Sequence, residues 1–291
     1  MSLTNTNLVS TNNETYENSI TPQNNLFDLR LAEIWQYRDL LLLFVRRDFV
    51  SKFKQTILGP LWFFIQPLFQ TVVMAIVFGG MAKLSTDGAP PILFYLAGVT
   101  AWNYFANCLR ATSNTFTANA GLFGKVYFPR AVMPLSIVIS NLVQFGIGLL
   151  LFLILYAYYA LQDHLLQPNS TLLLMPLLIA IMGFMGLGLG MIVSAMTTRY
   201  RDLQYLVEFG VQLMMYATPV ILPLSAVPSK YQLIMMVNPM TGVIETFKYG
   251  FLGTGTFSWP LIAYSTGFTL IVFLSGLAIF NKTEKNFMDT V

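Results

Sequence analysis

Long apolar runs alternate with short polar segments along most of this chain. Six of the runs are about 20 residues or longer and contain few or no charged side chains. A helix of about 20 residues rises roughly 30 Å, which matches the hydrocarbon core of a bilayer. The pattern therefore predicts an all-α membrane protein. Its six expected transmembrane helices cover residues 58–80, 92–113, 131–159, 172–196, 203–222 and 259–280.

The segment before the first run follows a different pattern. Residues 28–54 carry apolar side chains at helical spacing, with Arg and Lys on the opposite side. The apolar positions are Leu31, Ile34 or Trp35, Leu42, Val45, Phe49 and Phe53. We expect an amphipathic helix on the cytoplasmic face, acting either as a plain lipid anchor or also as a docking site for a soluble partner. Residues 1–27 have few aromatic or branched apolar side chains, which predicts a disordered tail.

Between the fifth and sixth runs, residues 223–258 are too long for a turn and too interrupted for a span. Lys230, Glu245 and Lys248 break the apolar pattern, and three prolines punctuate it. We expect one or two short helices that dip into the outer leaflet or lie on it, packed against protein where the backbone is irregular. The fourth run contains small residues that allow close helix approach. These are Gly183, Gly186, Gly188 and Gly190.

The positive charges indicate the orientation. Only three of the 16 Lys and Arg residues, Lys83, Lys230 and Lys248, fall on one side of this layout, and the other 13 fall on the opposite side. Lys and Arg near the ends of spans are retained in the cytoplasm, so both termini are expected there, including a tail at 282–291. The composition, 55% hydrophobic and 10% charged, agrees with a multi-pass protein of the inner (plasma) membrane.

If this membrane protein transports a substrate, its residues argue against two ways of driving that transport, namely ATP hydrolysis on this chain and coupling to an ion gradient. The chain has no GxxxxGK[ST] motif, since Lys125 is followed by Val126 and no Ser or Thr is placed to hold magnesium. Ion coupling usually places paired carboxylates or histidines in the middle of the membrane. Here Glu208 is expected only about one turn inside the cytoplasmic end of the fifth span. If ATP drives transport, its hydrolysis is expected on another chain.

Enzymatic and metal chemistry find little support in the sequence. The single histidine, His164, stands beside Asp163 in an expected external loop, where an ordinary solvated histidine is the simpler interpretation. The single cysteine, Cys108, excludes an intrachain disulfide and a cysteine-based metal cluster. We expect no cofactor bound to this chain, no metal site and no nucleic-acid partner.

Polar and aromatic side chains share one face in two of the predicted spans. The first-span stripe holds Trp62, Gln66 and Phe69 or Gln70, and the fifth-span stripe holds Tyr205, Glu208, Gln212 and Tyr216. Amides that face lipid are costly, so these stripes are expected to face protein or water. A wet channel edged by rings and amides suits a glycan. The alternative stays open that the amides bridge neighbouring helices and the rings belong to an interface belt.

Several motifs in order resemble one family. The segment QTILGPLWFFIQP at 55–67 follows the basic helix, TTRYRD at 197–202 lies between spans four and five, and TPVILP at 218–223 is followed by Asn238-Pro239. Together they resemble the type-2 ABC export permeases, and within them the branch that exports O-antigen, capsule and teichoic acid. The resemblance covers roughly residues 30–285. One departure is Lys248, where the family pattern leads us to expect an arginine.

This resemblance implies a homodimer whose two copies line one channel through the membrane. It also implies two ATP-binding cassette subunits on the cytoplasmic side, which bind ATP and magnesium in place of this chain. The expected cargo is a lipid-linked polysaccharide, O-antigen first. Capsule, teichoic acid or a small hydrophobic drug are the alternatives within the family, and an ion-coupled secondary transporter is a more distant one. An ion-coupled transporter would work without ATP and would often show an internal repeat.

With the resemblance, three groups of residues acquire expected roles. A cytoplasmic coupling segment, residues 117–128, is expected to contact the ATPase through Asn119, Leu122, Phe123, Lys125 and Tyr127; the alternative is an ordinary loop held at the headgroups. The substrate is expected to enter near Arg46, Arg47, Lys52 and Lys54, which otherwise hold anionic lipid. Residues 223–253, the outer segment, are expected to gate the channel or to cap the bundle. Its marked positions are Pro223, Pro228, Asn238 and Pro239.

Overall fold

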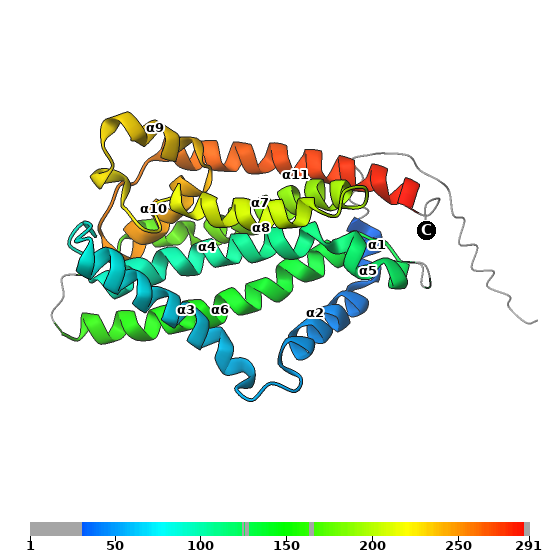
Figure 1. The fold of residues 1–291 in the computed structure, drawn as a ribbon, viewed down its shortest axis with the longest axis horizontal. Helices are drawn as coiled ribbons and strands as arrows, with labels where there is room; N and C mark the ends of the chain where they lie inside the picture. Colours follow the sequence, from blue (N-terminus) through cyan, green and yellow to red (C-terminus); the bar gives the residue numbers. More distant parts are fainter. Residues whose placement is uncertain (1–30, 124, 126–127, 163–165, 288–291) are drawn as a thin grey trace, which may run out of the picture.

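The computed structural model describes residues 31–123, 125, 128–162 and 166–287, and every regular element in this part of the chain is a helix (Figure 1). An all-α fold is therefore confirmed. The longer elements are α1 (Leu31–Gln36), α2 (Arg38–Phe53), α3 (Trp62–Met74), α4 (Pro91–Ser113), α5 (Thr115–Phe123), α6 (Val132–Ala160), α7 (Met175–Thr197), α8 (Leu203–Tyr216), α9 (Ser229–Val237), α10 (Met240–Leu252) and α11 (Trp259–Phe287). The disorder predicted for residues 1–27 lies outside the described residues, as do Asp163, His164 and the end of the tail.

Five helical segments are long and apolar enough to cross a membrane, among the residues described. They are Gly59–Met81, Pro91–Ser113, Val132–Ala160, Ser170–Thr197 and Trp259–Thr283. The first combines a short 3₁₀ turn, α3 and a π-helical end at Ala75–Met81, and the fourth adds the 3₁₀ turn Ser170–Leu174 to α7. All five agree with predicted runs to within three residues at each end.

The predicted fifth span, residues 203–222, is shorter as a helix than expected. Helix α8 has 14 residues and ends at Tyr216. At ~1.5 Å per residue it rises about 21 Å, less than the ~30 Å of a hydrocarbon core. The remaining residues, 217–222, form turns, because the sequence there includes Pro219 and then Pro223. A sixth crossing thus stays a prediction that needs α8 together with the irregular segment after it.

Helix α4 is the centre of the bundle and packs against α3, α6, α7, α8 and α10. Most of its side chains are fully buried, including the large rings of Phe94, Tyr95, Trp102 and Phe105. A mostly apolar 23-residue helix that is covered on nearly all sides is expected for the middle of a membrane bundle. The polar residues that α4 does carry are therefore the exceptions to explain.

The glycines of α7 let it lie directly against two neighbours. A Cβ atom at Gly186 would lie 2.7 Å from Cys108 Cβ of α4, and one at Gly188 would lie 2.7 Å from Phe273 Cα of α11. Such distances are far inside van der Waals contact, so only glycine fits at either position. The close approach predicted for these small residues is present. Inside lipid the hydrophobic effect does not hold helices together, so the van der Waals contacts made at such close approaches stabilise the bundle.

The N-terminal helices differ in detail from the predicted amphipathic helix. Two helices, α1 and α2, meet at Tyr37, and apolar residues surround α2 instead of forming one stripe. Ile34 and Phe44 are buried against the bundle, whereas Trp35 and Leu42, both placed in the predicted stripe, are exposed. Helices α2 and α3 diverge as a V from the loop at 54–58 (Figure 1). The exposed apolar residues of α2, Leu42 and Leu43 among them, are thus free to contact lipid.

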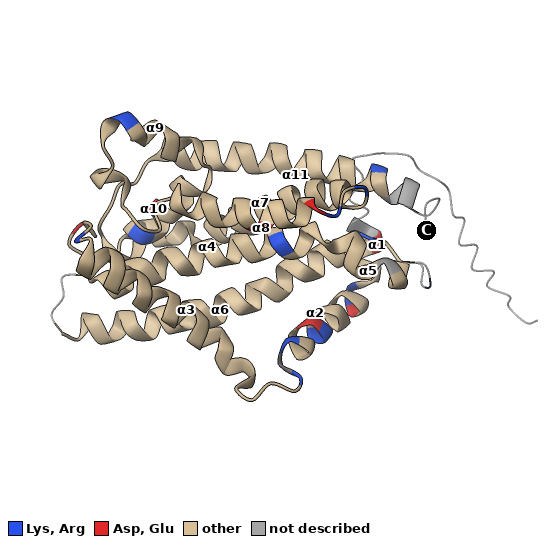
Figure 2. Cartoon of the chain, in the orientation of Figure 1, with Lys and Arg blue, Asp and Glu red and all other residues tan. Residues whose placement is uncertain are grey.

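Figure 1 separates the two ends of the bundle. One end gathers α1, α5 and the last turns of α11, where Phe116 of α5 stacks on Phe280 of α11 at 4.5 Å between ring centroids. The other end gathers α9 and α10 of the outer segment. Figure 2 shows that charged residues concentrate on α2 and at these ends, with few along the bundle between them.

Candidate functional site

A cavity of about 820 Å³ lies among α3, α4, α6 and α8, beside the last turn of α2. Eight amide side chains, Gln66, Gln70, Asn103, Asn107, Asn114, Asn141, Gln144 and Gln212, line it. Two cations, Lys52 and Arg110, join them, and no Asp or Glu is among the described residues that form the lining. Five aromatic residues complete the wall. They are Trp62, Phe63, Trp102, Tyr104 and Phe145.

The polar face of α4 forms one wall of this cavity. Asn103, Asn107, Arg110 and Asn114 follow one another at spacings of three or four residues, which places them on one side of a helix. The opposite faces of α4 are apolar and packed, so the stripe turns toward the cavity. Asn103 Nδ2 donates a hydrogen bond to Gln70 Oε1 of α3 at 3.3 Å, which ties two walls together.

Several of the amides have no partner in the protein. Within the described part of the chain, the side chains of Gln66, Asn107 and Gln212 make no hydrogen bond. The buried Oδ1 atom of Asn114 and the Oγ1 atom of Thr100, also in the lining, have none either. Gln66 and Gln212 are exposed and Asn107 is partly buried, so water reaches their amides. A buried polar atom without a partner costs about 1–3 kcal/mol. The buried atoms of Asn114 and Thr100 therefore indicate that water or a polar ligand supplies their missing hydrogen bonds.

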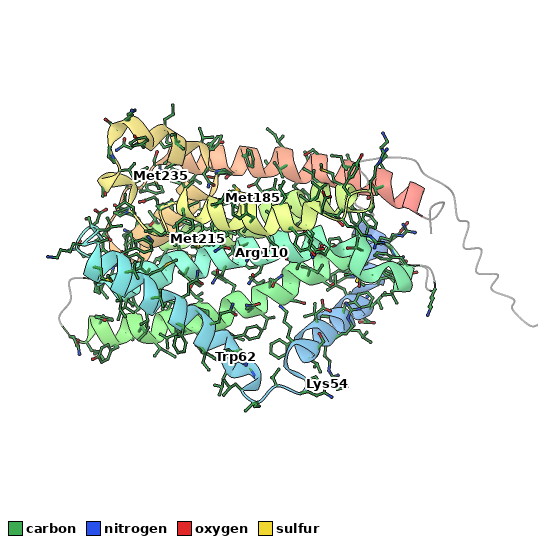
Figure 3. The ribbon with its side chains drawn as sticks, viewed as in Figure 1. Lys54, Trp62, Arg110, Met185, Met215 and Met235 are labelled. Carbon is green, nitrogen blue, oxygen red and sulfur yellow. The ribbon has the colours of Figure 1, made fainter. Side chains whose placement is uncertain are left out.

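The two cations reach the cavity from different helices. Lys52, in the last turn of α2, donates from Nζ to Gln144 Oε1 of α6 at 3.4 Å. Lys52 is exposed overall, but the part of it that the protein covers is desolvated, which lowers its pKa, and the nearby Asp48 carboxylate partly offsets that effect. Arg110 lies near the C-terminal end of α4, inside the bundle, whereas Lys54 lies at its edge (Figure 3).

Four of the eight residues predicted to line a channel do line the cavity, and four do not. Trp62, Gln66, Gln70 and Gln212 all line the cavity. The other four, Phe69, Tyr205, Glu208 and Tyr216, are exposed on the outer sides of α3 and α8 and lie outside it. Gln70 is partly buried and accepts a hydrogen bond from Asn103 of α4, whereas Trp62, Gln66 and Gln212 line the cavity and are exposed. The exposed rings face the surroundings of the single chain, so a channel role for them stays a prediction.

Of the four cations predicted where substrate enters, only Lys52 lines the cavity. Arg46, Arg47 and Lys54 are exposed. Arg47 is occupied locally, because its guanidinium forms an ion pair with Asp48 at 2.8 Å and lies 4.8 Å above the Phe44 ring. A charge cluster seen in sequence does not converge on one point when it lies on a helix, since successive residues point 100° apart.

The predicted ATPase-coupling residues have unlike surroundings. Phe123 is 4% exposed and packs against Phe116 and Phe128 of the same chain, so its ring is not available to a partner. Asn119 Nδ2 donates to Thr115 O within α5 at 2.9 Å. Lys125 is exposed and Leu122 is partly exposed, while Tyr127 lies outside the described residues. Any docking surface here uses the outer side of α5, with Phe123 holding that helix in place.

The outer segment consists of a 3₁₀ turn at Leu224–Ala226 followed by α9 and α10. Asn238 is buried: its Oδ1 accepts from Met240 N at 3.0 Å, and its Nδ2 donates to Ala217 O at 3.4 Å. Pro239 is the residue directly before α10, which begins at Met240. Pro223 is buried and Pro228 is exposed. Asn238-Pro239 thus acts as a cap for α10, which supports the structural alternative for these two residues.

Two charged side chains of α10 fasten the outer segment, and sequence reasoning gave them no role. The Glu245 carboxylate, 1% exposed, accepts hydrogen bonds from Leu224 N at 2.8 Å and Thr256 N at 3.1 Å. Lys248, equally buried, donates from Nζ to the carbonyls of Pro219 and Val220, and its ammonium lies 3.2 Å from the centre of the Phe94 ring. The signal in the sequence was two opposite charges, three residues apart, within an otherwise apolar helix.

The most informative residues missed as site candidates are those of the α4 stripe and of α6. Asn107, Arg110, Asn141 and Gln144 line the cavity, although none was predicted to line a channel. The spacing of the α4 residues is visible in the sequence. The packing of α4 against α6, which brings these residues together, cannot be predicted from residue spacing within one helix.

Comparison with known proteins adds a family to this geometry. An O-antigen export system permease protein, RfbA, of Klebsiella pneumoniae is 28% identical over 252 residues, covering 86% of this chain and 94% of the relative. RfbA of Myxococcus xanthus is 27% identical over 264 residues, 90% and 98% of the two chains. The polysialic acid transport protein KpsM of Escherichia coli is 23% identical over 248 residues, 82% and 91%. The family described as ABC-2 type transporter matches residues 39–252, and this chain belongs to that family.

Proposed function

We propose that this chain is the transmembrane subunit of an ATP-driven exporter of a lipid-linked polysaccharide. The chain is a multi-pass membrane protein of a transporter family, and its relatives are named for the export of O-antigen and the transport of polysialic acid. O-antigen is the proposed cargo, because the two RfbA relatives have the higher identities among those compared. Transport runs from the cytoplasm across the inner membrane.

The observation that carries this proposal is the lining of the cavity. Eight amides and five aromatic rings face a hollow of about 820 Å³, inside a chain that is 55% hydrophobic. Amides exchange hydrogen bonds with sugar hydroxyls, and rings stack on the apolar faces of sugars. Because most of these groups are neutral, each contact is weak. A polymer can therefore slide past the wall without being held at one point.

The motor and the second half of the channel belong to other chains in this proposal. Two ATP-binding cassette subunits hydrolyse ATP on the cytoplasmic side, where α1, α2 and α5 meet, and both termini lie on that side. Two copies of this chain join so that their cavities share one conduit, with the exposed rings of α3 and α8, including Phe69 and Tyr216, at or near the joint. The outer segment closes the conduit when no polymer is present.

Other cargoes would need different side chains in the cavity lining. A small hydrophobic drug favours an apolar lining, which the amides oppose. Ion coupling favours carboxylates, and none is among the described residues that line the cavity. Export of polysialic acid is the second candidate, favoured by the KpsM relative. Polysialic acid carries a carboxylate on every sugar, so it would contact Lys52 and Arg110 along its whole length.

Reconstitution with the partner ATPase tests the proposal. The complex is placed in vesicles with lipid-linked O-antigen on the ATPase side, and the polymer that reaches the other side is counted with and without ATP. The same vesicles are tested with polysialic acid as cargo. We expect ATP-dependent transfer of O-antigen and less of polysialic acid. Transfer without ATP, or transfer of neither glycan by an active ATPase complex, contradicts the proposal.

A further inference from the structure

Arg110 is one of two charged residues that line the cavity, and it is the one whose side chain has no hydrogen bond or ion pair within the described chain. It is partly buried in the wall that α4 contributes, inside one of the five helical segments able to cross a membrane. No carboxylate of the described chain lies within ion-pair distance of its guanidinium, and the side chain donates no hydrogen bond to the protein. The guanidinium thus keeps all of its donors for whatever fills the cavity.

A guanidinium without a partner is unusual at such a place. Charged residues in membrane-spanning segments are expensive, and they are retained where they pair with another group or meet a water-filled path. The neighbouring amides cannot neutralise the charge, because they are dipoles. Two cations and no Asp or Glu are among the described residues that line the cavity, an arrangement that favours an anion. An anion is therefore the ligand that this wall lacks.

Lys52 supplies a second cation from a different direction. It reaches the same cavity from α2, on the side where α2 and α3 diverge, and Gln144 orients its ammonium. Among the described residues, the nearby Asp48 carboxylate forms an ion pair with Arg47, so it is already shared with another cation. Two cations on separate helices facing one hollow can hold a group with several anionic oxygens. A guanidinium fork matches phosphate in particular.

We propose that Arg110 and Lys52 bind the phosphate or diphosphate group that joins the glycan to its lipid carrier. This inference rests on the proposed function and assigns its substrate contact. The neutral amides contact the sugars, and the two cations contact the one strongly anionic part of the cargo. Arg46, Arg47 and Lys54, which lie outside the cavity, have no part in this contact.

Binding of a short prenyl diphosphate isolates the phosphate contact from the glycan. The complete permease–ATPase complex in lipid nanodiscs is titrated with radiolabelled farnesyl diphosphate, and farnesol serves as the uncharged probe. We expect Arg110→Gln to weaken binding of farnesyl diphosphate by at least about tenfold, as the loss of a charged hydrogen-bonding partner predicts. Arg110→Lys keeps the charge without the fork and should lose less. Lys52→Gln should weaken binding severalfold, and farnesol should not distinguish any variant.

The matched control is Arg46→Gln, which removes the same charge from the exposed side of α2. Equal binding of farnesyl diphosphate by wild type and Arg110→Gln, with both complexes folded by size-exclusion chromatography, overturns the inference. So does an equal loss in Arg46→Gln. If Arg110→Gln does not fold, Arg110→Lys and Lys52→Gln decide, and unchanged binding in both overturns it.

A lipid headgroup offers the same chemistry, so a second arm separates the sources. Nanodiscs are made with phosphatidylcholine alone or with one-third phosphatidylglycerol. Competition by phosphatidylglycerol that abolishes binding of the prenyl diphosphate means a lipid site and overturns the inference. Export of polymer by the wild-type complex is measured in parallel. Failure of wild-type export refutes the proposed function, whereas intact export with unaltered binding in Arg110→Gln refutes only the phosphate contact.

Discussion

Two regions of this molecule treat their polar side chains in opposite ways. Around α10, each described charge is occupied by backbone: Glu245 accepts from two amide N–H groups and Lys248 donates to two carbonyls. Around the cavity, the partly buried Asn107 and Arg110 and the exposed Gln66 make no hydrogen bond through their side chains within the described chain. The first arrangement holds irregular backbone in place. The second leaves donors and acceptors for something that is not part of the chain.

The difference shows how to separate structural from functional polarity in a membrane bundle. A buried polar group that is fully paired stabilises one arrangement and is expensive to break. An unpaired one lowers stability and persists only where function requires it. Because both kinds are rare residues in apolar helices, the sequence alone marks them equally. Their partners tell them apart.

The largest effect is expected where α7 and α11 pack backbone against backbone. Gly188→Leu places side-chain atoms where the backbone of Phe273 lies, and backbone cannot move aside without displacing α11. We expect a loss above about 3 kcal/mol and little folded protein, measured by fluorescence-detected size-exclusion chromatography in detergent. Gly146→Leu on α6, which meets no atom within 4 Å, is the control. A folded Gly188→Leu protein would contradict the packing.

The next effect concerns the paired region. Glu245→Ala leaves Leu224 N and Thr256 N without an acceptor, which costs about 1–3 kcal/mol for each group. We expect a lower thermal midpoint and faster proteolysis at both ends of the outer segment. Glu245→Gln keeps one acceptor oxygen and should fall between. Glu208→Ala, which removes an exposed carboxylate, should leave the midpoint unchanged; an equal loss there would show that the effect is not specific.

Much of the architecture was predictable, for reasons that particular residues illustrate. Apolar runs gave five segments that agree with the structure, because the hydrophobic length of a span is a local property. The glycines of α7 were recognised for the same reason. Helix α8 was drawn too long, because Ile221 and Leu222 continue the apolar run, whereas Pro219 and Pro223 prevent the helix. Hydropathy measures how apolar a segment is. It does not show whether the backbone of that segment can form helical hydrogen bonds.

The site was predictable only in part, because a cavity is made by several helices. Trp62, Gln66 and Gln212 were identified from the polar faces of their own helices, and they line the cavity. The same reasoning selected Tyr205, which lies outside. The arginines of α2 were predicted as a site because they form a cluster in the sequence. The arginine that lines the cavity is instead Arg110 of α4, whose polar neighbours on that helix are amides. A stripe of amides with one cation was the better signal than a run of cations.

A smaller effect should reveal the opposite behaviour of paired and unpaired amides. Asn107→Leu removes an amide that has no protein partner, so we expect unchanged or higher thermal stability with export reduced about two- to tenfold. Asn169→Leu removes one that donates to Tyr249 O at 2.8 Å and accepts from Thr171 N at 3.1 Å. It should lower stability and leave the export rate per folded complex unchanged. If both variants lose stability equally, the unpaired state of Asn107 is refuted.

The smallest effect is expected from the cations that lie outside the cavity. Replacing Arg46 and Arg47 together with Gln removes two exposed charges and one ion pair, that of Arg47 with Asp48. Exposed ion pairs contribute only about 0–1 kcal/mol, so folded abundance should hardly change. Surface polysaccharide, measured against that abundance, should stay within about twofold of wild type. A large loss of export at normal abundance would move the site of substrate contact from the cavity to the surface of α2, and the contrast drawn between Arg110 and the α2 arginines would fail.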